Sequence, residues 1–384
     1  MTNITQITPK RHKSKNNDLE RIYVLDVLRG LTLFGILVIH SFNDFTTIRE
    51  ESMDASLLSP QDRILDIAIS NLFSKVLYSI FSFLFGLSFA IQMNSAISKG
   101  QSFSGRFLWR LTVLLMIGYV HSLFFPRDIL QLYALLGMAL ILVKDLSPSR
   151  LLWLSLILFG LSIGISFFNA DIEKEVVHLA SKTREFIVVQ FLGLSKLDYL
   201  VLSGRLFTVF SLFILGLYAG KRGLFNKNPE NSVFFTKLMY WSFGTTLVVG
   251  GIYLYLKHTF EVPGKYVEAV FSIERMTQSI FYVSLLVYLY RFKILKRFFD
   301  MLIPVGKMGL TVYVTQSFFL IWLYAKDPAE ILDFGLVGVM AVTTGFFLIQ
   351  LTFAWVWMSI FRFGPLEWLW RSATFLQVIP ILRR

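Results

Sequence analysis

Long apolar runs separated by short polar stretches form the main pattern along this chain of 384 residues. About 20 apolar residues in a helix cover the hydrocarbon core of a bilayer, so each run is a candidate membrane span. The fourth and sixth runs are the shortest. Together the runs predict an all-α fold, a polytopic membrane bundle of about ten transmembrane helices. The expected spans cover residues 24–41, 72–93, 107–125, 129–143, 151–168, 206–219, 238–256, 273–290, 301–324 and 334–361.

Charges between the runs are distributed unevenly. If both ends of the chain are cytoplasmic, the inner segments hold 23 of the 37 Lys and Arg residues and the outer segments hold 12. Acidic residues show the opposite bias, with 18 in outer segments and 6 in inner ones. Because cytoplasmic loops are enriched in Lys and Arg, this bias predicts a multi-pass cell-membrane protein with cytoplasmic N- and C-termini. The net charge of +12 then faces cytoplasm and anionic membrane lipid, so no nucleic-acid partner is expected.

The same pattern divides the chain into three parts. Residues 1–20 are expected to be a disordered basic cytoplasmic tail, and residues 21–361 the transmembrane bundle. Residues 362–384 are expected to be an interfacial amphipathic cytoplasmic tail, because Glu367 and Arg371 stand four residues apart beside two tryptophans. The outer segments 43–71 and 169–205 exceed simple turns and could cover the outer mouth. The chain has no cysteine, which excludes disulfides, thiolate catalysis and Cys-based metal sites.

Three ionisable residues lie in the first expected span, residues 24–41 of the stretch VLDVLRGLTLFGILVIHSFND. His40 follows Arg29 by 11 residues, which brings it back to the same helix face about 16 Å further along the axis. Asp26 flanks the same stripe. Ionisable groups within a membrane often mark a functional site, and this stripe suggests catalytic roles for His40, Arg29 and Asp26. The alternative is a structural Asp26–Arg29 pair at the cytoplasmic interface.

A second group is expected at the outer end of the bundle, at the depth of His40. His121 ends the third expected span, and Asp128 stands at the start of the fourth. A His–Asp pair can act as a general base, since the carboxylate fixes the tautomer and stabilises the imidazolium. Lys75 and Gln316 also lie within expected spans and are assigned with this pair to the acceptor side. Alternatively, His121 and Asp128 merely end a helical hairpin. Zinc is less favoured because no HExxH motif occurs, and no metal is expected.

Basic residues gather at the inner ends of the spans. Arg106 and Arg110 stand at the start of the third span, and Lys221 and Arg222 follow the sixth. Such clusters bind lipid headgroups or the phosphates of a cytoplasmic donor such as a coenzyme A ester. The alternative is that they only determine topology. Neither a Walker A motif nor GxGxxG occurs, so no nucleotide-binding glycine loop is predicted.

Several segments resemble, in the same order, those of the YeiB family of bacterial membrane proteins, which carry a domain of unknown function. They are LDVLRGLTLFGILVIH, FSFLFGLSFAIQM, the stretch 121–137, LFILGLYAGKRGLF, GKMGLTVYVTQS and FGPLEWLWR. The family is similar to transmembrane acyltransferases, among them heparan-alpha-glucosaminide N-acetyltransferase and bacterial O-acyltransferases that modify envelope sugars. Those enzymes carry an arginine in the first span and Asn or His eleven positions later, here Arg29 and His40. YeiB-like chains more often have Asn at this position, whereas bacterial O-acyltransferases have His.

The resemblance implies an acyltransferase that moves an acyl group, acetyl for preference, from cytoplasmic acyl-CoA to an extracytoplasmic small-molecule or glycan acceptor. His40 would act as general base or carry the acyl group, and Arg29, held by Asp26, would orient the donor or the histidine. His121 and Asp128 would bind or activate the acceptor. The alternative is a transporter or lipid-handling protein in which the same groups line a path. The sequence does not specify an oligomeric state.

Overall fold

The computed structural model describes residues 11–51, 59–74, 76–182, 200–201, 203–259 and 262–383. Within these ranges the regular structure is helical, and the only β pairing is the isolated bridge between Phe361 and Leu382. The all-α prediction is therefore confirmed. The helices are α1 (Arg11–Glu51), α2 (Pro60–Leu72), α3 (Val76–Ile97), α4 (Ser104–Ser122), α5 (Leu130–Val143), α6 (Pro148–Lys182), α9 (Arg205–Lys221), α10 (Pro229–His258), α11 (Gly264–Leu289), α12 (Lys293–Asp300), α13 (Ile303–Lys307), α14 (Gly309–Leu323), α15 (Pro328–Ile360) and α16 (Pro365–Phe375).

Each expected apolar segment lies largely within a helix, in chain order α1, α3, α4, α5, α6, α9, α10, α11, α14 and α15. In the described part of the chain, four segments are long and apolar enough to cross a membrane: Tyr23–Glu50, Pro60–Ile97, Pro148–Asn169 and Pro328–Ile360. The 14 residues of α5 extend only about 21 Å, less than the thickness of a hydrocarbon core. Several helices thus have the character of membrane spans.

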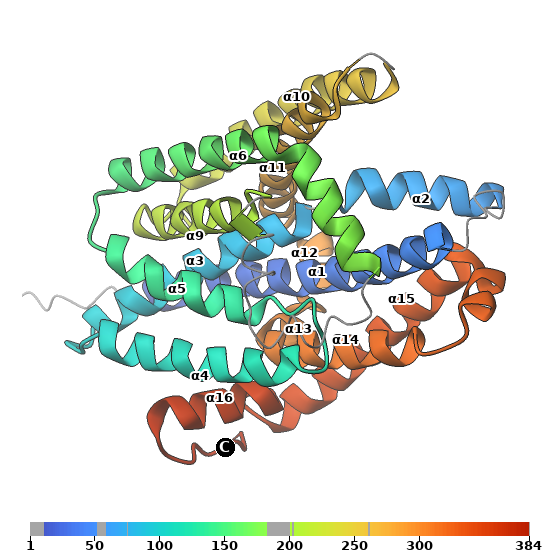
Figure 1. Cartoon of the computed structure of the whole chain (residues 1–384). Coiled ribbons are helices and arrows are strands. Elements are labelled where there is room, and N and C mark those ends of the chain that lie inside the picture. The colour runs from blue at the N-terminus through green and yellow to red at the C-terminus, as the bar shows by residue number, and fades with distance from the viewer. Residues whose placement is uncertain are drawn as a thin grey trace, which may run out of the picture.

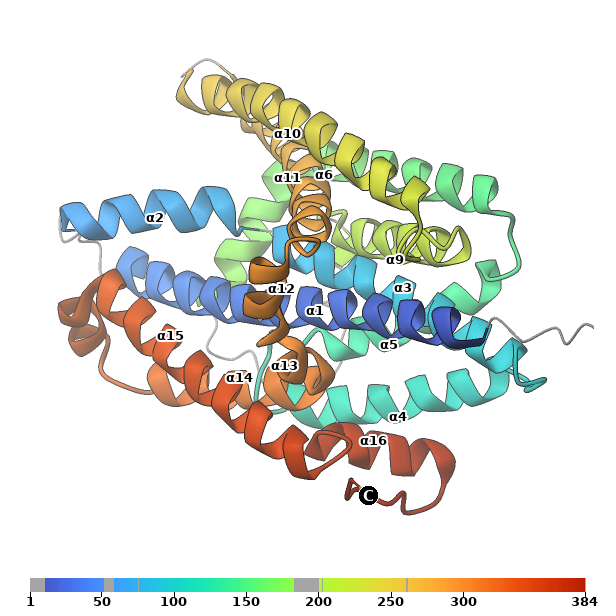
Figure 2. The ribbon, with the colours of Figure 1, turned by 180° about the vertical axis from the view of Figure 1, so that it is seen from behind.

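α1 is the central helix of the bundle. It packs against α3, α13, α14 and α15, and α11, α12 and α13 follow one another across it (Figures 1 and 2). Leu33 and Leu37 on α1 are completely buried. In Figure 1 most helices run from left to right, with α2 at the right beside the far end of α1. The start of α1 and the short helix α16 lie toward the opposite end.

Helices α3 and α9 touch through their backbones. A Cβ atom added at Gly86 would lie 1.9 Å from the carbonyl oxygen of Phe213, and one added at Gly216 would lie 2.1 Å from that of Phe83. One turn further along α9, a Cβ at Gly220 would lie 2.3 Å from the Cβ of Ala90. Small residues spaced four apart allow such close approach between membrane helices, so van der Waals contact holds this pair together.

The expected span 301–324 is not one continuous helix. The chain forms α13, breaks at Met308 and resumes as α14. A Cβ atom at Gly306 would lie 1.8 Å from the carbonyl oxygen of Asp26, so α13 packs directly on the backbone of α1. The Glu367 carboxylate accepts hydrogen bonds from the first amides of α14, those of Leu310 at 2.6 Å and Thr311 at 3.1 Å. This carboxylate supplies the partners that a restarted helix needs.

α16 lies in the segment expected to be an interfacial helix and is fastened to α4. The Trp109 indole of α4 donates to the carbonyl oxygen of Ala373 at 3.1 Å. In return, the Trp370 indole donates to the carbonyl oxygen of Arg110 at 2.8 Å. These two indole N–H groups, one on each helix, anchor α16 at this surface. The boundaries at residues 20 and 361 stay predictions, although α1 already begins at Arg11.

The two long outer segments are described to different extents. Segment 43–71 contains the end of α1 and most of α2, whereas residues 52–58 lie outside the described part. The Asp62 carboxylate of α2 accepts the amide of Val337 at 2.8 Å, just after α15 is broken at Gly335, where φ is 71°. Only glycine adopts such a conformation readily. In segment 169–205, α6 continues to Lys182 and residues 183–199 are outside the described part.

Candidate functional site

Asp26 and Arg29 form an ion pair in the first half of α1. Nη1 of Arg29 donates to Oδ1 of Asp26 at 2.6 Å, and Nη2 donates to the Ser88 hydroxyl of α3 at 2.6 Å. The side chain of Asp26 is 3% exposed and that of Arg29 is 27% exposed. Arg29 therefore keeps access to its surroundings while its guanidinium is held from two sides. It bonds Ser88 rather than His40, which lies about three turns further along the helix.

His40 lies toward the other end of α1 and is buried. Its Nε2 and the Tyr78 hydroxyl of α3 are hydrogen-bonded at 2.9 Å, and the two rings meet edge to face. Nδ1 of His40 is also buried and has no hydrogen-bond partner in the part of the chain that the structure describes. The imidazole is thus oriented through one nitrogen, while the other is unsatisfied.

His121 and Asp128 form the pair that the sequence predicts. Oδ1 of Asp128 accepts Nδ1–H of His121 at 2.7 Å, and both residues are buried. The other carboxylate oxygen accepts the amide of Gln131 at 3.2 Å at the start of α5. With Nδ1 protonated, Nε2 carries the lone pair, and the Ser317 hydroxyl of α14 donates to it at 2.6 Å. The turn after α4 and the distant helix α14 therefore meet at this imidazole.

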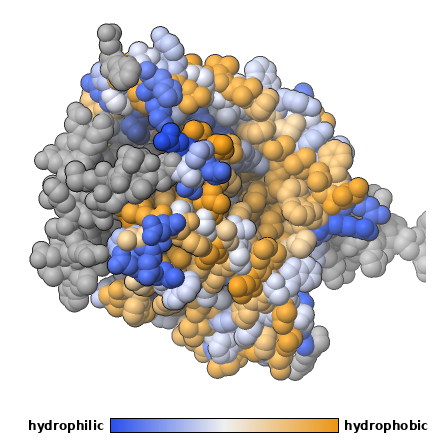
Figure 3. Space-filling model, turned by 90° about the vertical axis from the view of Figure 1, so that its right-hand side faces the viewer, coloured by the Kyte–Doolittle hydropathy of each residue, from blue (hydrophilic) through white to orange (hydrophobic). Residues whose placement is uncertain are grey.

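The Phe125 ring connects the two histidines. It lies in the turn between α4 and α5, with ring centroids 5.6 Å from His40 and 5.7 Å from His121. The Arg127 guanidinium lies 5.3 Å from the same ring and forms a two-point ion pair with Asp44 of α1. Figure 3 shows the molecule from this end, where hydrophilic residues gather near the middle of the face. The two histidines thus share one end of the bundle, as predicted.

The arrangement does not fit a metal ion. Both ring nitrogens of His121 are already engaged, by Asp128 and by Ser317. No group of three His, Asp or Glu residues in the described ranges is placed to hold a metal. Two histidines and a carboxylate would each have to offer a free donor atom to bind zinc.

Gln316 faces the interior, as expected for a polar residue within a span. Its Nε2 donates to the carbonyl oxygen of Leu33 at 3.3 Å and to Oε1 of Gln350 at 3.2 Å. Gln350 in turn donates to Thr315 at 2.7 Å. These bonds join α14 to α1 and α15, so Gln316 has a packing role whether or not it touches a substrate. Lys75, also assigned to the acceptor side, lies outside the described residues.

The four basic residues expected to bind the donor lie in two places. Arg106 and Arg110 belong to the first turns of α4, beside α16, and the Arg110 guanidinium covers the Trp370 ring at 4.0 Å. Lys221 ends α9 and donates to a backbone carbonyl of the α5–α6 turn at 2.8 Å. Arg222 follows it and is exposed. Burial lowers the pKa of Lys221, with repulsion from a neighbouring lysine adding to this effect.

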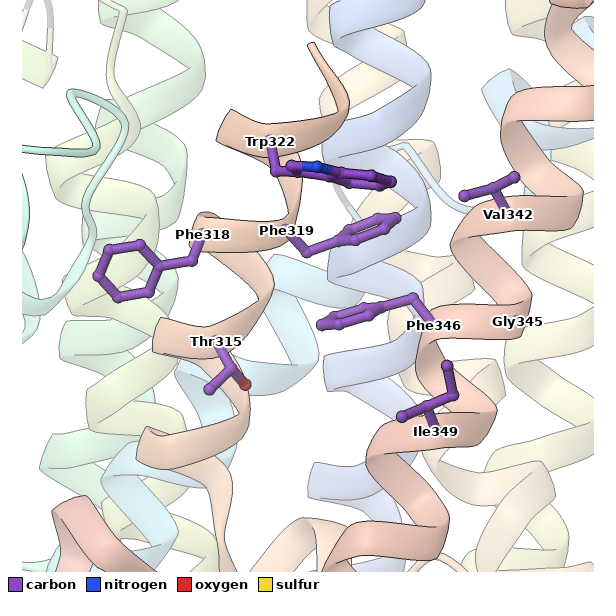
Figure 4. A pocket seen from close by; sticks show the side chains of 8 residues that line it. All are labelled: Thr315, Phe318, Phe319, Trp322, Val342, Gly345, Phe346 and Ile349. Atoms are coloured by element: carbon purple, nitrogen blue, oxygen red, sulfur yellow. The ribbon is translucent and has the colours of Figure 1, made fainter. Parts of the chain in front are cut away.

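A groove of about 680 Å³ lies between α14 and α15, away from the histidines (Figure 4). The rings of Phe319 and Phe346 stack across it with centroids 4.0 Å apart. Thr315 and Trp322 are the two residues with hydrogen-bonding side chains among those that line it. The groove therefore offers no ionisable group, and the candidate site is the pair of histidines.

Comparisons with known proteins cover nearly the whole chain. It is 30% identical over 403 aligned residues to YxaH of Bacillus subtilis (strain 168), covering 95% of this chain and 97% of that protein. Residues 219–377 match the family described as "Protein of unknown function (DUF418)". The chain belongs to the DUF418 family. The 39.9 kDa protein in the amylase 3' region of Bacillus acidopullulyticus is 27% identical, covering 94% of this chain and 96% of that protein. YeiB of Escherichia coli (strain K12) is 23% identical, and the alignment covers 95% of this chain and 99% of that protein.

The DUF418 match and the full-length relatives cover different parts of the site. The matched segment 219–377 contains Ser317, while His40, His121 and Asp128 lie before it and within the full-length similarity. No solved structure matches the chain. The relationship to YeiB is confirmed, and none of these relatives carries an activity in its name.

Three residues of this family member's site were not assigned to it from the sequence. Tyr78 and Phe125 are ordinary aromatic residues of apolar runs by pattern alone. Ser317 is one of several polar residues within the expected span 301–324. A polar residue within a span must find a partner, and this was the one available signal for Ser317. Its partner, His121, is 196 residues away in sequence.

Proposed function

We propose that the protein is a membrane acyltransferase that moves an acyl group, acetyl for preference, from cytoplasmic acyl-CoA to an extracytoplasmic hydroxyl or amine. The observation that carries this proposal is the unpartnered, buried Nδ1 of His40 beside the Phe125 ring. A buried polar atom without a hydrogen bond costs about 1–3 kcal/mol. Proteins keep a buried atom without a hydrogen-bond partner at places where that atom binds a ligand.

His40 is arranged to accept a proton from the acceptor. When Nε2–H donates to the Tyr78 oxygen, Nδ1 carries the lone pair. An acceptor hydroxyl or amine bound at Nδ1 would lose its proton to this atom while it attacks the acyl carbonyl carbon. The bond from the acyl carbon to its leaving group then breaks, and the imidazolium, still bonded to Tyr78, gives up the proton to water.

Arg29 and the inner basic residues suit the donor. In the proposed topology of ten spans, both termini and α16 are cytoplasmic, consistent with the excess of Lys and Arg in the inner segments. Arg29 then lies on the inner half of α1, about 16 Å from His40 along the axis. The extended arm of an acyl-CoA can reach across this distance, with its phosphates near Arg106, Arg110, Lys221 or Arg222. Membrane lipids and a small-molecule or glycan acceptor complete the proposed partners.

The test is acyl transfer by membrane vesicles supplied with radiolabelled acetyl-CoA. Replacing His40 with Gln keeps a hydrogen bond to Tyr78 but removes the base, so transfer should fall by about 10²–10⁴-fold. His258→Gln, at the exposed end of α10, is the matched control and should retain full transfer. His40→Asn separates two roles, because activity in this variant would mean that the residue orients the acceptor rather than taking its proton.

Two results would refute the proposal. Full transfer by His40→Gln would remove His40 from the mechanism. If wild-type vesicles transferred no label to any acceptor or lipid with any acyl-CoA tried, the protein would not be an acyltransferase. Transport of an unaltered substrate would then be the function.

A further inference from the structure

We propose that Ser317, His121 and Asp128 form a Ser–His–Asp triad in which Ser317 is a nucleophile that carries the acyl group covalently. The Ser317 hydroxyl donates to Nε2 of His121 at 2.6 Å, and Nδ1–H of His121 donates to Asp128 at 2.7 Å. A nucleophile bonded to a base that a third group orients is the general signature of such sites. It is recognised by geometry and not by the order of residues in the chain.

The order of these contacts fixes the direction of proton transfer. Asp128 accepts from Nδ1 and from the amide of Gln131, so its carboxylate is held as an acceptor on both oxygens. The tautomer of His121 is thereby set with the lone pair on Nε2, facing Ser317. Ser317 is 3% exposed and Asp128 is 2% exposed, so both residues are shielded from bulk water.

Helix packing alone does not require this arrangement. A serine in a helix can satisfy its hydroxyl with a carbonyl three or four residues earlier, as Ser284 does with Ile280 at 2.8 Å. Ser317 has such a carbonyl available, that of Val314 at 2.9 Å, yet Nε2 of His121 lies closer. A buried carboxylate is expensive to place in a membrane protein and is unnecessary for packing a serine.

Tyr313 completes the site as a group that can stabilise an oxyanion. It stands one turn before Ser317 on the same face of α14, and its ring centroid lies 5.4 Å from that of His121. Its hydroxyl accepts the amide of Ile129 at 3.3 Å. The Tyr313 hydroxyl can therefore donate its own proton in a hydrogen bond to the negative oxygen that develops beside Ser317 during the reaction.

The chemistry balances with an acyl thioester as donor, a choice that rests on the proposed function. Ser317 Oγ attacks the carbonyl carbon while its proton passes to Nε2 of His121. The C–S bond then breaks and leaves an ester on Ser317; coenzyme A departs as its thiolate, which water protonates, and His121 keeps the serine proton. The acceptor hydroxyl or amine next attacks this ester and gives its proton to Nδ1 of His40, which contacts the same Phe125 ring as His121. His121 returns its proton to Ser317 Oγ as the ester bond breaks, and His40 releases the acceptor proton to water.

A fluorophosphonate probe tests the triad without any acyl donor, because it reacts with serines activated by an imidazole. Membranes containing the full chain should be labelled, and peptide mass spectrometry should place the adduct on Ser317. Ser317→Ala should abolish labelling, and Asp128→Asn should slow it by about 10²-fold or more. Ser211→Ala is the matched control, since this serine is completely buried and bonded to Ser155 without any imidazole. It should label as the wild type does.

A second variant keeps the proposal falsifiable if Ser317→Ala does not fold. The chain has no cysteine, so Ser317→Cys carries a single thiol at the position of the nucleophile. Beside His121 this thiol should react with iodoacetamide at a pH below that required by Ser211→Cys, and the additional change Asp128→Asn should abolish the difference. An adduct elsewhere, no adduct on the wild type, or equal thiol reactivity in the two cysteine variants would overturn the triad. Labelling without acyl transfer would instead overturn the proposed function and leave the triad standing.

Discussion

Replacing Glu367 should separate α16 from the start of α14. Its carboxylate accepts the amides of Leu310 at 2.6 Å and Thr311 at 3.1 Å, and the Thr311 hydroxyl at 2.6 Å. Losing a helix cap typically costs about 1 kcal/mol, and a hydrogen bond to a charged group contributes about 1.5–3 kcal/mol. Since the three bonds share one carboxylate, Glu367→Ala should lower the free energy of unfolding by about 2–4 kcal/mol in total.

Thermal unfolding in detergent, followed by loss of the monodisperse peak, measures this change. At about 2 °C per kcal/mol for a large chain, Glu367→Ala should lower the midpoint by about 4–8 °C. Glu367→Gln keeps one accepting oxygen and should lower the midpoint by less than Glu367→Ala does. Glu230→Ala is the control, because Glu230 stands exposed in the first turn of α10. A midpoint for Glu367→Ala equal to that of the control would refute the capping role.

The same carboxylate gives a pH dependence with a definite sign. Burial raises the pKa of Glu367 above its ordinary value, although hydrogen bonds from Thr311 and Leu310 oppose the shift. The folded chain then binds this proton more tightly than the unfolded chain. Stability should therefore fall as pH rises from the ordinary glutamate pKa through the raised one. This decline should be absent in Glu367→Gln, and an identical pH profile in both proteins would contradict the assignment.

Two further predictions concern the ion pair on α1 and the topology. Breaking a buried ion pair costs about 3–5 kcal/mol, so Asp26→Asn and Arg29→Gln should each reduce the folded yield in detergent. The double variant should lose less folded yield than the two single variants lose together. Strictly additive losses would show that the two residues do not interact. A cysteine at Lys99, in the turn between α3 and α4, should be shielded from an impermeant thiol reagent in intact cells, whereas one at Ala329 should react. Labelling at Lys99 from outside would invert the proposed topology.

Hydropathy predicted the helices well because a span must satisfy its backbone internally, and apolar length alone reports this requirement. It did not predict the break at Met308, next to the point where Gly306 packs on the backbone of α1. The His121–Asp128 pair was predictable because only a short turn separates the two residues. Ser317 reaches His121 only through the packing of α14, which no local pattern contains. The same holds for Tyr78 and His40, which come together from separate helices.

The glycine contacts between α3 and α9 determine which part of the bundle can move. Two backbones in direct contact cannot slide or tilt without colliding, because no side chain lies between them to change rotamer. The two helices therefore behave as one rigid unit. Tyr78, which is hydrogen-bonded to His40, belongs to this unit. Any hinge that admits a substrate has to lie on the opposite side, among α4, α14 and α15. There the helices are already interrupted at two points, Met308 and Gly335. In the proposed mechanism, His40 would thus be oriented from the rigid pair of helices, while the interrupted helices that face it would control access.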